Sequence, residues 1–98
     1  MRIEILDDAQ EDLIQGFYFY ETLGTGVGSH FLDCLFSDID TPLHYSGIHP
    51  IVYGYHRSLS RCFPFAIYYD VAGEVIRVNA VLDCRRNPSW IRKRLDRG

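Results

Sequence analysis

The sequence of 98 residues is poor in the features that mark several large protein classes. Its three cysteines, Cys34, Cys62 and Cys84, are odd in number and widely spaced, without a Cys-x-x-Cys pair or a histidine at ligand spacing. This pattern argues against both a disulfide framework and a zinc site. No run approaches the ~18 apolar residues of a membrane span, and residues 1–4 do not resemble a signal peptide. We therefore expect a soluble cytoplasmic protein without metal, cofactor or membrane partner.

What is present indicates a small folded protein. A hydrophobic content of 47% excludes a disordered chain. The length allows one domain, residues 1–98. A domain of this size buries only ~60–65% of the surface of its unfolded chain, so we do not expect a deep, enclosed active-site cavity.

The charges are divided unevenly along the chain. Residues 1–55 contain nine acids and one base, whereas residues 56–98 contain nine bases and four acids, giving net charges of −8 and +5. Nine of the ten bases are arginine, which suits carboxylates, phosphates and aromatic faces, and Lys93 is the only lysine. This asymmetry indicates either a basic face for an acidic or polyanionic partner, or acidic helices that pair with the basic half internally.

Hydrophobic periodicity predicts the elements of the acidic half. Residues 2–6 alternate as a strand, and residues 9–23 form a helix that begins with a capping box at Asp8 and Glu11. The glycine-rich residues 24–28 follow a helix and lack the dinucleotide-binding spacing, so we interpret them as a turn between helices. A second helix covers residues 27–40, with its acids on the outer face or at its end, and Pro42 marks where it stops.

The basic half reads mainly as sheet. Residues 43–55 are predicted as a loop with tyrosine anchors, followed by strands at 56–63, 65–69 and 74–82. Asn87 and Pro88 supply an N-cap and a first-turn proline for a short helix over residues 88–95. The predicted order is β-α-α-β-β-β-α. This is an α+β fold with an N-terminal helical hairpin packed on a small, mostly antiparallel sheet and a short C-terminal helix.

Two motifs in this order resemble those of the RelE/ParE toxin superfamily, also called plasmid-stabilisation proteins. The first is Arg57 with the segment CFPFAIYY at 62–69, and the second is VLDCRRNPSW at 81–90, followed by Arg94 and Leu95. The helix segments with Ala9, Asp12 and Leu13 and with Phe31 and Leu32 extend the resemblance over nearly the whole chain. It implies the toxin of a type II toxin–antitoxin module, neutralised by a cognate antitoxin that wraps a segment around it.

The superfamily has two functional branches. RelE-like members cut mRNA at the ribosome, whereas ParE-like members have no nuclease activity and poison DNA gyrase. Cleavage of RNA needs a base, an acid and cations on the phosphate. Here Ala66 stands where the nuclease pattern has an arginine, Trp90 stands near its tyrosine, and Asp83 replaces a common histidine. We therefore expect a ParE-like toxin, with a RelE-like endonuclease as the alternative, in which His56 or Asp83 would serve as base.

The surface expected to bind the antitoxin or the target is rich in arginine. It comprises Arg57, Arg61, Arg85, Arg86, Trp90 and Arg94. Its acidic partner would be an antitoxin segment, and the target would be gyrase or the ribosome with mRNA. Toxin and antitoxin could together form a hetero-oligomer.

Structural roles for the same residues remain open at this stage. Arg85 and Arg86 could pair with Asp83, Trp90 could anchor the last helix in the core, and the C-terminal bases could form a solvated helix surface. Of the neighbours Tyr68 and Tyr69, one ring is expected in the core and the other at the disposal of a partner. A chain that has lost its toxicity and keeps only antitoxin binding is a third possibility.

Overall fold

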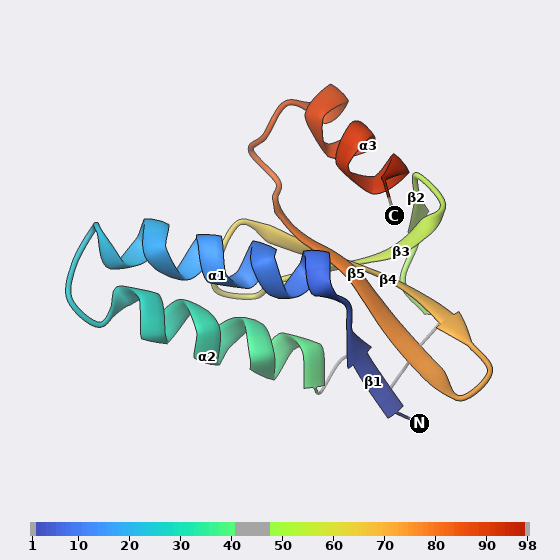
Figure 1. Ribbon diagram of the computed structural model, residues 1–98, viewed down its shortest axis with the longest axis horizontal. Coiled ribbons are helices and arrows are strands. Elements are labelled where there is room, and N and C mark those ends of the chain that lie inside the picture. Colours follow the sequence, from blue (N-terminus) through green and yellow to red (C-terminus); the bar gives the residue numbers. More distant parts are fainter. Residues whose placement is uncertain (1, 41–47, 98) are drawn as a thin grey trace.

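The computed structural model describes residues 2–40 and 48–97 (Figure 1). Its elements are β1 (Arg2–Ile5), α1 (Asp7–Glu21), α2 (Val27–Asp40), β2 (Ile51–Val52), β3 (Tyr55–Leu59), β4 (Phe65–Ala72), β5 (Val75–Asp83) and α3 (Pro88–Asp96). The α+β class and the predicted order are confirmed, with one addition, the two-residue strand β2.

The five strands form one mixed sheet in the order β1-β5-β4-β3-β2. β1 runs parallel to β5, and the other neighbours are antiparallel. The hairpin of α1 and α2 covers one face of this sheet and α3 lies on the other (Figure 1). Alternation along β4 divides its side chains between the two faces, so that Ile67 and Tyr69 face the hairpin while Ala66 and Tyr68 face α3.

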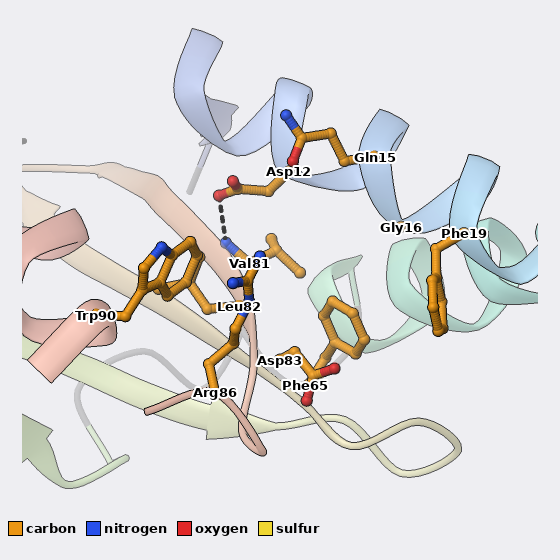
Figure 2. Close-up of a pocket in the computed structure, with 10 residues that line it drawn as sticks. All are labelled: Asp12, Gln15, Gly16, Phe19, Phe65, Val81, Leu82, Asp83, Arg86 and Trp90. Atoms are coloured by element: carbon orange, nitrogen blue, oxygen red, sulfur yellow. Dashed lines mark hydrogen bonds between the residues drawn. The ribbon is translucent and has the colours of Figure 1, made fainter. Parts of the chain in front are cut away.

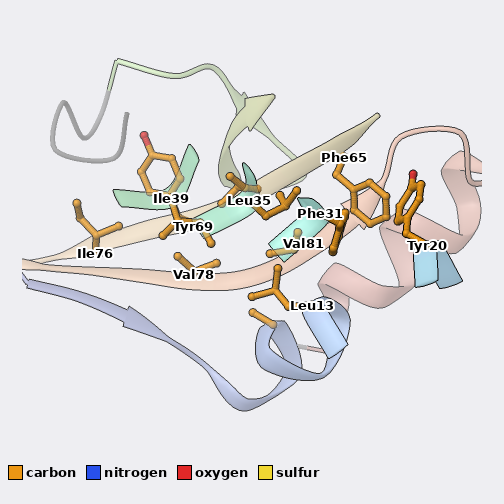
Figure 3. Close-up of a cluster of buried hydrophobic side chains, with 12 residues drawn as sticks. Leu13, Tyr20, Phe31, Leu35, Ile39, Phe65, Tyr69, Ile76, Val78 and Val81 are labelled. Atoms are coloured by element: carbon orange, nitrogen blue, oxygen red, sulfur yellow. The ribbon is translucent and has the colours of Figure 1, made fainter. Parts of the chain in front are cut away.

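The main hydrophobic core lies between the hairpin and the sheet (Figure 3). At one end Tyr20 and Phe31 stack with ring centroids 5.1 Å apart, and Phe65 meets Phe31 edge-to-face at 4.9 Å. Its buried members are Ala9, Leu13, Tyr20, Phe31, Leu35, Ile39, Phe65, Ile67, Tyr69, Ile76, Val78 and Val81.

Two glycines let the helices of the hairpin approach closely. A Cβ on Gly28 would lie 2.6 Å from the carbonyl oxygen of Phe17, and one on Gly16 would lie 2.5 Å from the Phe31 ring. Gly26 has φ +88°, in the left-handed region that favours glycine, and turns the chain between the helices. The glycine-rich segment is therefore the inter-helix turn predicted from sequence. The carboxylate of Glu21 accepts hydrogen bonds there from the amides of Gly26 and Gly28.

A second, smaller cluster lies between the opposite sheet face and α3. Its buried members are Ala66, Tyr68, Ala80, Leu82, Ile91 and Leu95. The Tyr55 hydroxyl donates to the Leu95 carbonyl at 3.4 Å, which ties the end of α3 to β3. Tyr68 and Tyr69 are both buried, at 2% and 0% exposure. The prediction that one of these rings is available to a partner is wrong, because each sheet face is covered by helix at this position.

The local boundaries differ from the predictions in several places. Helix α1 begins at Asp7 after an N-cap at Leu6 that makes no side-chain cap bond, so the capping box of Asp8 and Glu11 is absent. Instead, the side-chain amide of Gln10 donates to the Ile5 carbonyl at 2.8 Å. The predicted strand 56–63 ends at Leu59, because residues 60–64 turn towards α2. Of the predicted loop, residues 51–52 and 55 belong to strands. Pro42 and residues 43–47 lie outside the described residues.

Candidate partner-binding surface

Ion pairs within the molecule neutralise part of the charge difference between the two halves of the chain. Three pairs join the acidic half of the chain to the basic half: Asp12 with Arg94, Asp38 with Arg61, and Asp8 with Arg97. Pairing of acidic helices with the basic half is therefore realised for these three arginines.

Asp12 and Arg94 form the most buried of these pairs, with side chains 12% and 9% exposed. The Arg94 Nη2 donates to Asp12 Oδ2 at 2.6 Å and to the Asp8 carbonyl at 3.1 Å. The same Asp12 oxygen accepts from the Val81 amide at 3.0 Å. Burial raises the pKa of Asp12 above its usual value, and the bonds from Val81 and Arg94 oppose this. Arg94 thus joins α3 to α1, and we leave it out of the proposed surface.

Asp38 is a carboxylate buried in α2, contrary to its predicted outer or terminal position. It is 1% exposed and accepts from the Ser60 hydroxyl at 2.6 Å, from the Arg61 amide at 3.3 Å and from the Arg61 Nε at 3.2 Å. These bonds hold the β3–β4 connection against α2. The Arg61 side chain is nevertheless 71% exposed, so the rest of its guanidinium faces solvent.

Arg85 and Asp83 form a local pair in the turn after β5. The Arg85 Nε and Nη2 donate to the two carboxylate oxygens of Asp83 at 3.0 and 2.8 Å, and the Arg85 amide adds a bond at 2.8 Å. The hydrogen bonds and charge of Arg85 lower the pKa of Asp83. A carboxylate held in this way is a weaker base than an ordinary aspartate, which is the opposite of what a nuclease base requires.

Arg57 differs from these arginines, because no carboxylate binds it within residues 2–40 and 48–97. It lies on β3 opposite Tyr68, on the sheet face that α3 covers in part. Its Nε is buried and has no hydrogen-bond partner among the described residues. Its charge favours ionisation of the nearby Tyr68 hydroxyl and Cys84 thiol, although burial raises the pKa of both groups. Arg57 is therefore a half-buried cation without a carboxylate partner among the described residues.

Arg86, just before α3, and Trp90, in its first turn, contact each other at the surface. The Arg86 guanidinium carbon lies 4.1 Å above the centre of the Trp90 ring, a cation–π contact. Arg86 has no carboxylate partner in the part of the chain that the structure describes. Trp90 is 37% exposed, so it is not the core anchor considered from sequence. Ile91 and Leu95 fill that role.

Both residues border a groove of about 370 Å³ between α1, the end of β5 and α3 (Figure 2). Gln15 and Phe19 lie on its α1 side, and Phe65 and Leu82 line it from the sheet. Phe19 is 53% exposed and was not among the candidates from sequence. Phe19 is a bulky aromatic outside the buried stripe of α1 that contains Leu13, Gly16 and Tyr20. An aromatic residue off the buried stripe is the sequence feature that could have identified Phe19 as a surface candidate.

The alternative nuclease base His56 lies on the other face of the sheet from Arg57. It stacks on the buried Tyr69 ring with centroids 5.1 Å apart, and its Nδ1 bonds to the His49 carbonyl at 2.8 Å. Asp83 pairs with Phe65 across β4 and β5 and is bound by Arg85. Of the two candidate bases, His56 is therefore on the opposite sheet face from Arg57, and Asp83 is bound by Arg85.

The predicted binding residues accordingly divide into two groups. Arg85, Arg86 and Trp90 lie around the end of β5 and the start of α3, and Arg57 lies on β3, on the sheet face that α3 covers in part. Arg61 and Arg94 are pinned to the helical hairpin by Asp38 and Asp12. In residues 2–40 and 48–97, no group of three or more histidines, cysteines or acids is placed to hold a metal ion. No helix within the same ranges has the length and apolar character needed to cross a bilayer.

Comparison with known proteins gives a likeness in structure. No protein-family model matches the sequence, and no curated protein matches it significantly. A chain from a solved structure described as "Chromosomal ParDE TA system from P. aeruginosa" matches with a TM-score of 0.72. The match covers 83% of this chain and 92% of that chain, at 17% sequence identity. At this identity the likeness establishes a shared fold, which is the fold that the sequence motifs predict.

Proposed function

We propose that this chain is the toxin of a type II toxin–antitoxin module, that it acts in the cytoplasm by binding and inhibiting DNA gyrase, and that a cognate antitoxin neutralises it. The observation that carries the proposal is the likeness over most of the chain to a ParDE chain, joined to the arginine and Pro-x-Trp motifs in the same order. The activity needs no cofactor or metal, because inhibition by binding involves no chemical step.

The distribution of charge supports a binding role. Arg57 and Arg86 keep guanidinium groups without carboxylate partners among the described residues, and Arg85 and Arg61 are exposed although paired. A buried donor without a partner costs stability, so its retention suits a group that acquires its partner in a complex. A carboxylate from an acidic antitoxin segment would supply a charge-assisted hydrogen bond to Arg57.

Expression and a gyrase assay test the toxin role. Induced expression should arrest growth, and co-expression of a cognate antitoxin, to be sought as a small acidic protein encoded next to this chain, should relieve the arrest. Purified protein in excess should block supercoiling by DNA gyrase and cause cleaved DNA to accumulate. Normal supercoiling without cleaved DNA would contradict gyrase as the target. Codon-specific cuts in ribosome-bound mRNA would instead establish the RelE-like endonuclease.

Single arginine substitutions test the binding surface. Arg57→Ala should weaken antitoxin binding most, by ~2–5 kcal/mol if its charge pairs with a buried carboxylate, and Arg86→Ala should weaken it less. Arg77→Ala is the matched control, because Arg77 pairs with Asp70 on the β4–β5 hairpin, away from the end of β5. Calorimetric titration at low and high salt gives the measurement. Equal affinity for all variants at both salt concentrations would show that the arginines do not form the interface.

A further inference from the structure

The groove between α1 and α3 has aromatic side chains on both sides. Phe19 stands on α1 and Trp90 on α3, and both point towards the groove, while Phe65 and Leu82 line it from the sheet (Figure 2). The two aromatic side chains are 53% and 37% exposed, although the chain buries aromatic rings elsewhere in its core. Large apolar side chains that are left exposed on facing walls indicate a surface that a partner covers.

The charges of the groove favour an acidic occupant. Its two carboxylates, Asp12 and Asp83, are already bound by Arg94 and Arg85. Arg86 lies over Trp90 and has no carboxylate partner within the described ranges. The groove therefore offers one uncompensated positive charge beside an apolar surface.

The size of the groove limits what can enter it. A volume of about 370 Å³ is at the small end of the range of ligand pockets and suits one or two large side chains. A nucleic acid strand carries a charge on every phosphate, whereas Arg86 is the one cation among the described residues that line the groove. A peptide that carries an apolar side chain next to a carboxylate satisfies both features.

We propose that this groove binds an acidic protein segment, with a leucine-sized or aromatic side chain inserted between Phe19 and Trp90 and a neighbouring carboxylate on Arg86. As the docking site of the antitoxin, it rests on the function proposed above. The partner's apolar anchor supplies most of the affinity, since aromatic residues at the centre of an interface dominate binding, and Arg86 supplies orientation and charge selection.

Trp90 is the only tryptophan of the chain, so its fluorescence reports directly on the groove. The probe is a synthetic peptide of glutamates that contains two leucines one helical turn apart. One control peptide replaces the leucines by serine, and the other replaces the glutamates by glutamine. Titration into the full chain should shift Trp90 emission with the first peptide, and binding of either control should be at least about tenfold weaker. Higher salt should weaken binding of the glutamate peptide and leave the glutamine peptide unaffected.

Variants locate the binding to the groove. Phe19→Ala and Arg86→Ala should each weaken binding of the leucine–glutamate peptide, the first by about tenfold or more. Tyr18→Ala is the control, because Tyr18 is a neighbouring exposed aromatic on α1 that does not line the groove. Circular dichroism confirms that each variant is folded. Absence of an emission shift, or an equal loss with Tyr18→Ala, would overturn the proposal.

The outcome is separable from that of the proposed function. Growth arrest relieved by a co-expressed antitoxin, together with no peptide binding, would refute the groove and leave the toxin role intact. Peptide binding lost with Phe19→Ala, together with normal growth on expression, would establish the groove and refute the toxin role.

Discussion

The two faces of the sheet differ in how completely they are packed. Twelve buried side chains close the face under the hairpin (Figure 3). Two glycines bring the helices of the hairpin into close contact. The face under α3 is closed by only six, with Arg57 beside them and Trp90 at the edge of the helix. Among the site residues proposed from sequence, those not joined to the helical hairpin by an ion pair, Arg57, Arg85, Arg86 and Trp90, lie on the α3 side or at the end of β5.

This difference indicates a division of labour. In a chain of 98 residues the buried surface is limited, so most of the stability must come from one well-packed face. The other face can then keep exposed aromatics and charges that cost stability, which suits the binding role proposed above. Substitutions in the core under the hairpin should therefore mainly lower stability, whereas substitutions of the exposed residues on the α3 side should mainly affect binding.

The largest effect is expected in the hairpin core. Phe31→Ala removes a fully buried ring that contacts Tyr20, Phe63 and Phe65, and should lower the free energy of unfolding by about 3–5 kcal/mol. Urea denaturation followed by circular dichroism measures it. Trp90→Ala, on the open side, should cost clearly less because that ring is partly exposed. Equal losses would contradict the division between the faces.

The next largest effect concerns the arginine that joins α3 to α1. Arg94→Met should lower the free energy of unfolding by about 3 kcal/mol, because it leaves the largely buried carboxylate of Asp12 without its counter-charge. The double variant with Asp12→Asn should recover part of this loss, since the uncompensated charge is then absent. No recovery would show that packing of the Arg94 side chain, rather than the pair, stabilises α3.

The same substitution at the open arginine should act in the other direction. Arg57→Met replaces a buried donor that has no partner among the described residues by an apolar group, and should raise the free energy of unfolding by about 1 kcal/mol. Thermal denaturation monitored by circular dichroism provides the comparison with Arg94→Met. A destabilised Arg57→Met protein would mean that the Arg57 guanidinium stabilises the fold, which would contradict its assignment as a binding residue.

The smallest effect is a dependence on pH. The pKa of Asp12 is raised by burial above 3.8, so the folded state holds this proton more tightly than the unfolded chain. The contribution of Asp12 to stability should therefore fall as pH rises from 3.8 through its higher folded pKa. The difference in free energy of unfolding between wild type and Asp12→Asn, measured across this range, should decrease with pH.

Asp83 supplies a control of opposite sign. Its pKa is lowered by Arg85, so its contribution is present above 3.8 and lost as pH falls through its lower folded value. The stability difference between wild type and Asp83→Asn should decrease with falling pH. The same slope for both substitutions would contradict the two assigned environments.

Much of the fold could be predicted from the sequence because its signals are local. The apolar spacing gave the bounds of α2, and Asn87 accepts from the Ser89 amide at 2.8 Å as the predicted N-cap of α3. The glycine-rich turn and the three long antiparallel strands likewise follow from residues that are neighbours along the chain. Arg57, Arg85 and Arg86 could be proposed as site residues because they stand in motifs of fixed spacing.

Contacts between distant segments were decided by the tertiary structure alone. Period two places Tyr68 and Tyr69 on opposite faces but does not reveal that helix covers both, so the free ring expected from sequence is buried. Arg94 meets Asp12 across 82 residues and Asp38 meets Arg61 across 23. No local pattern could distinguish these arginines from Arg57 and Arg86, which have no carboxylate partner among the described residues. The groove between Phe19 and Trp90 exists only because α1 and α3 meet at the end of β5. Sequence determined which side chains each element carries, and packing determined which of them are buried, paired or left exposed.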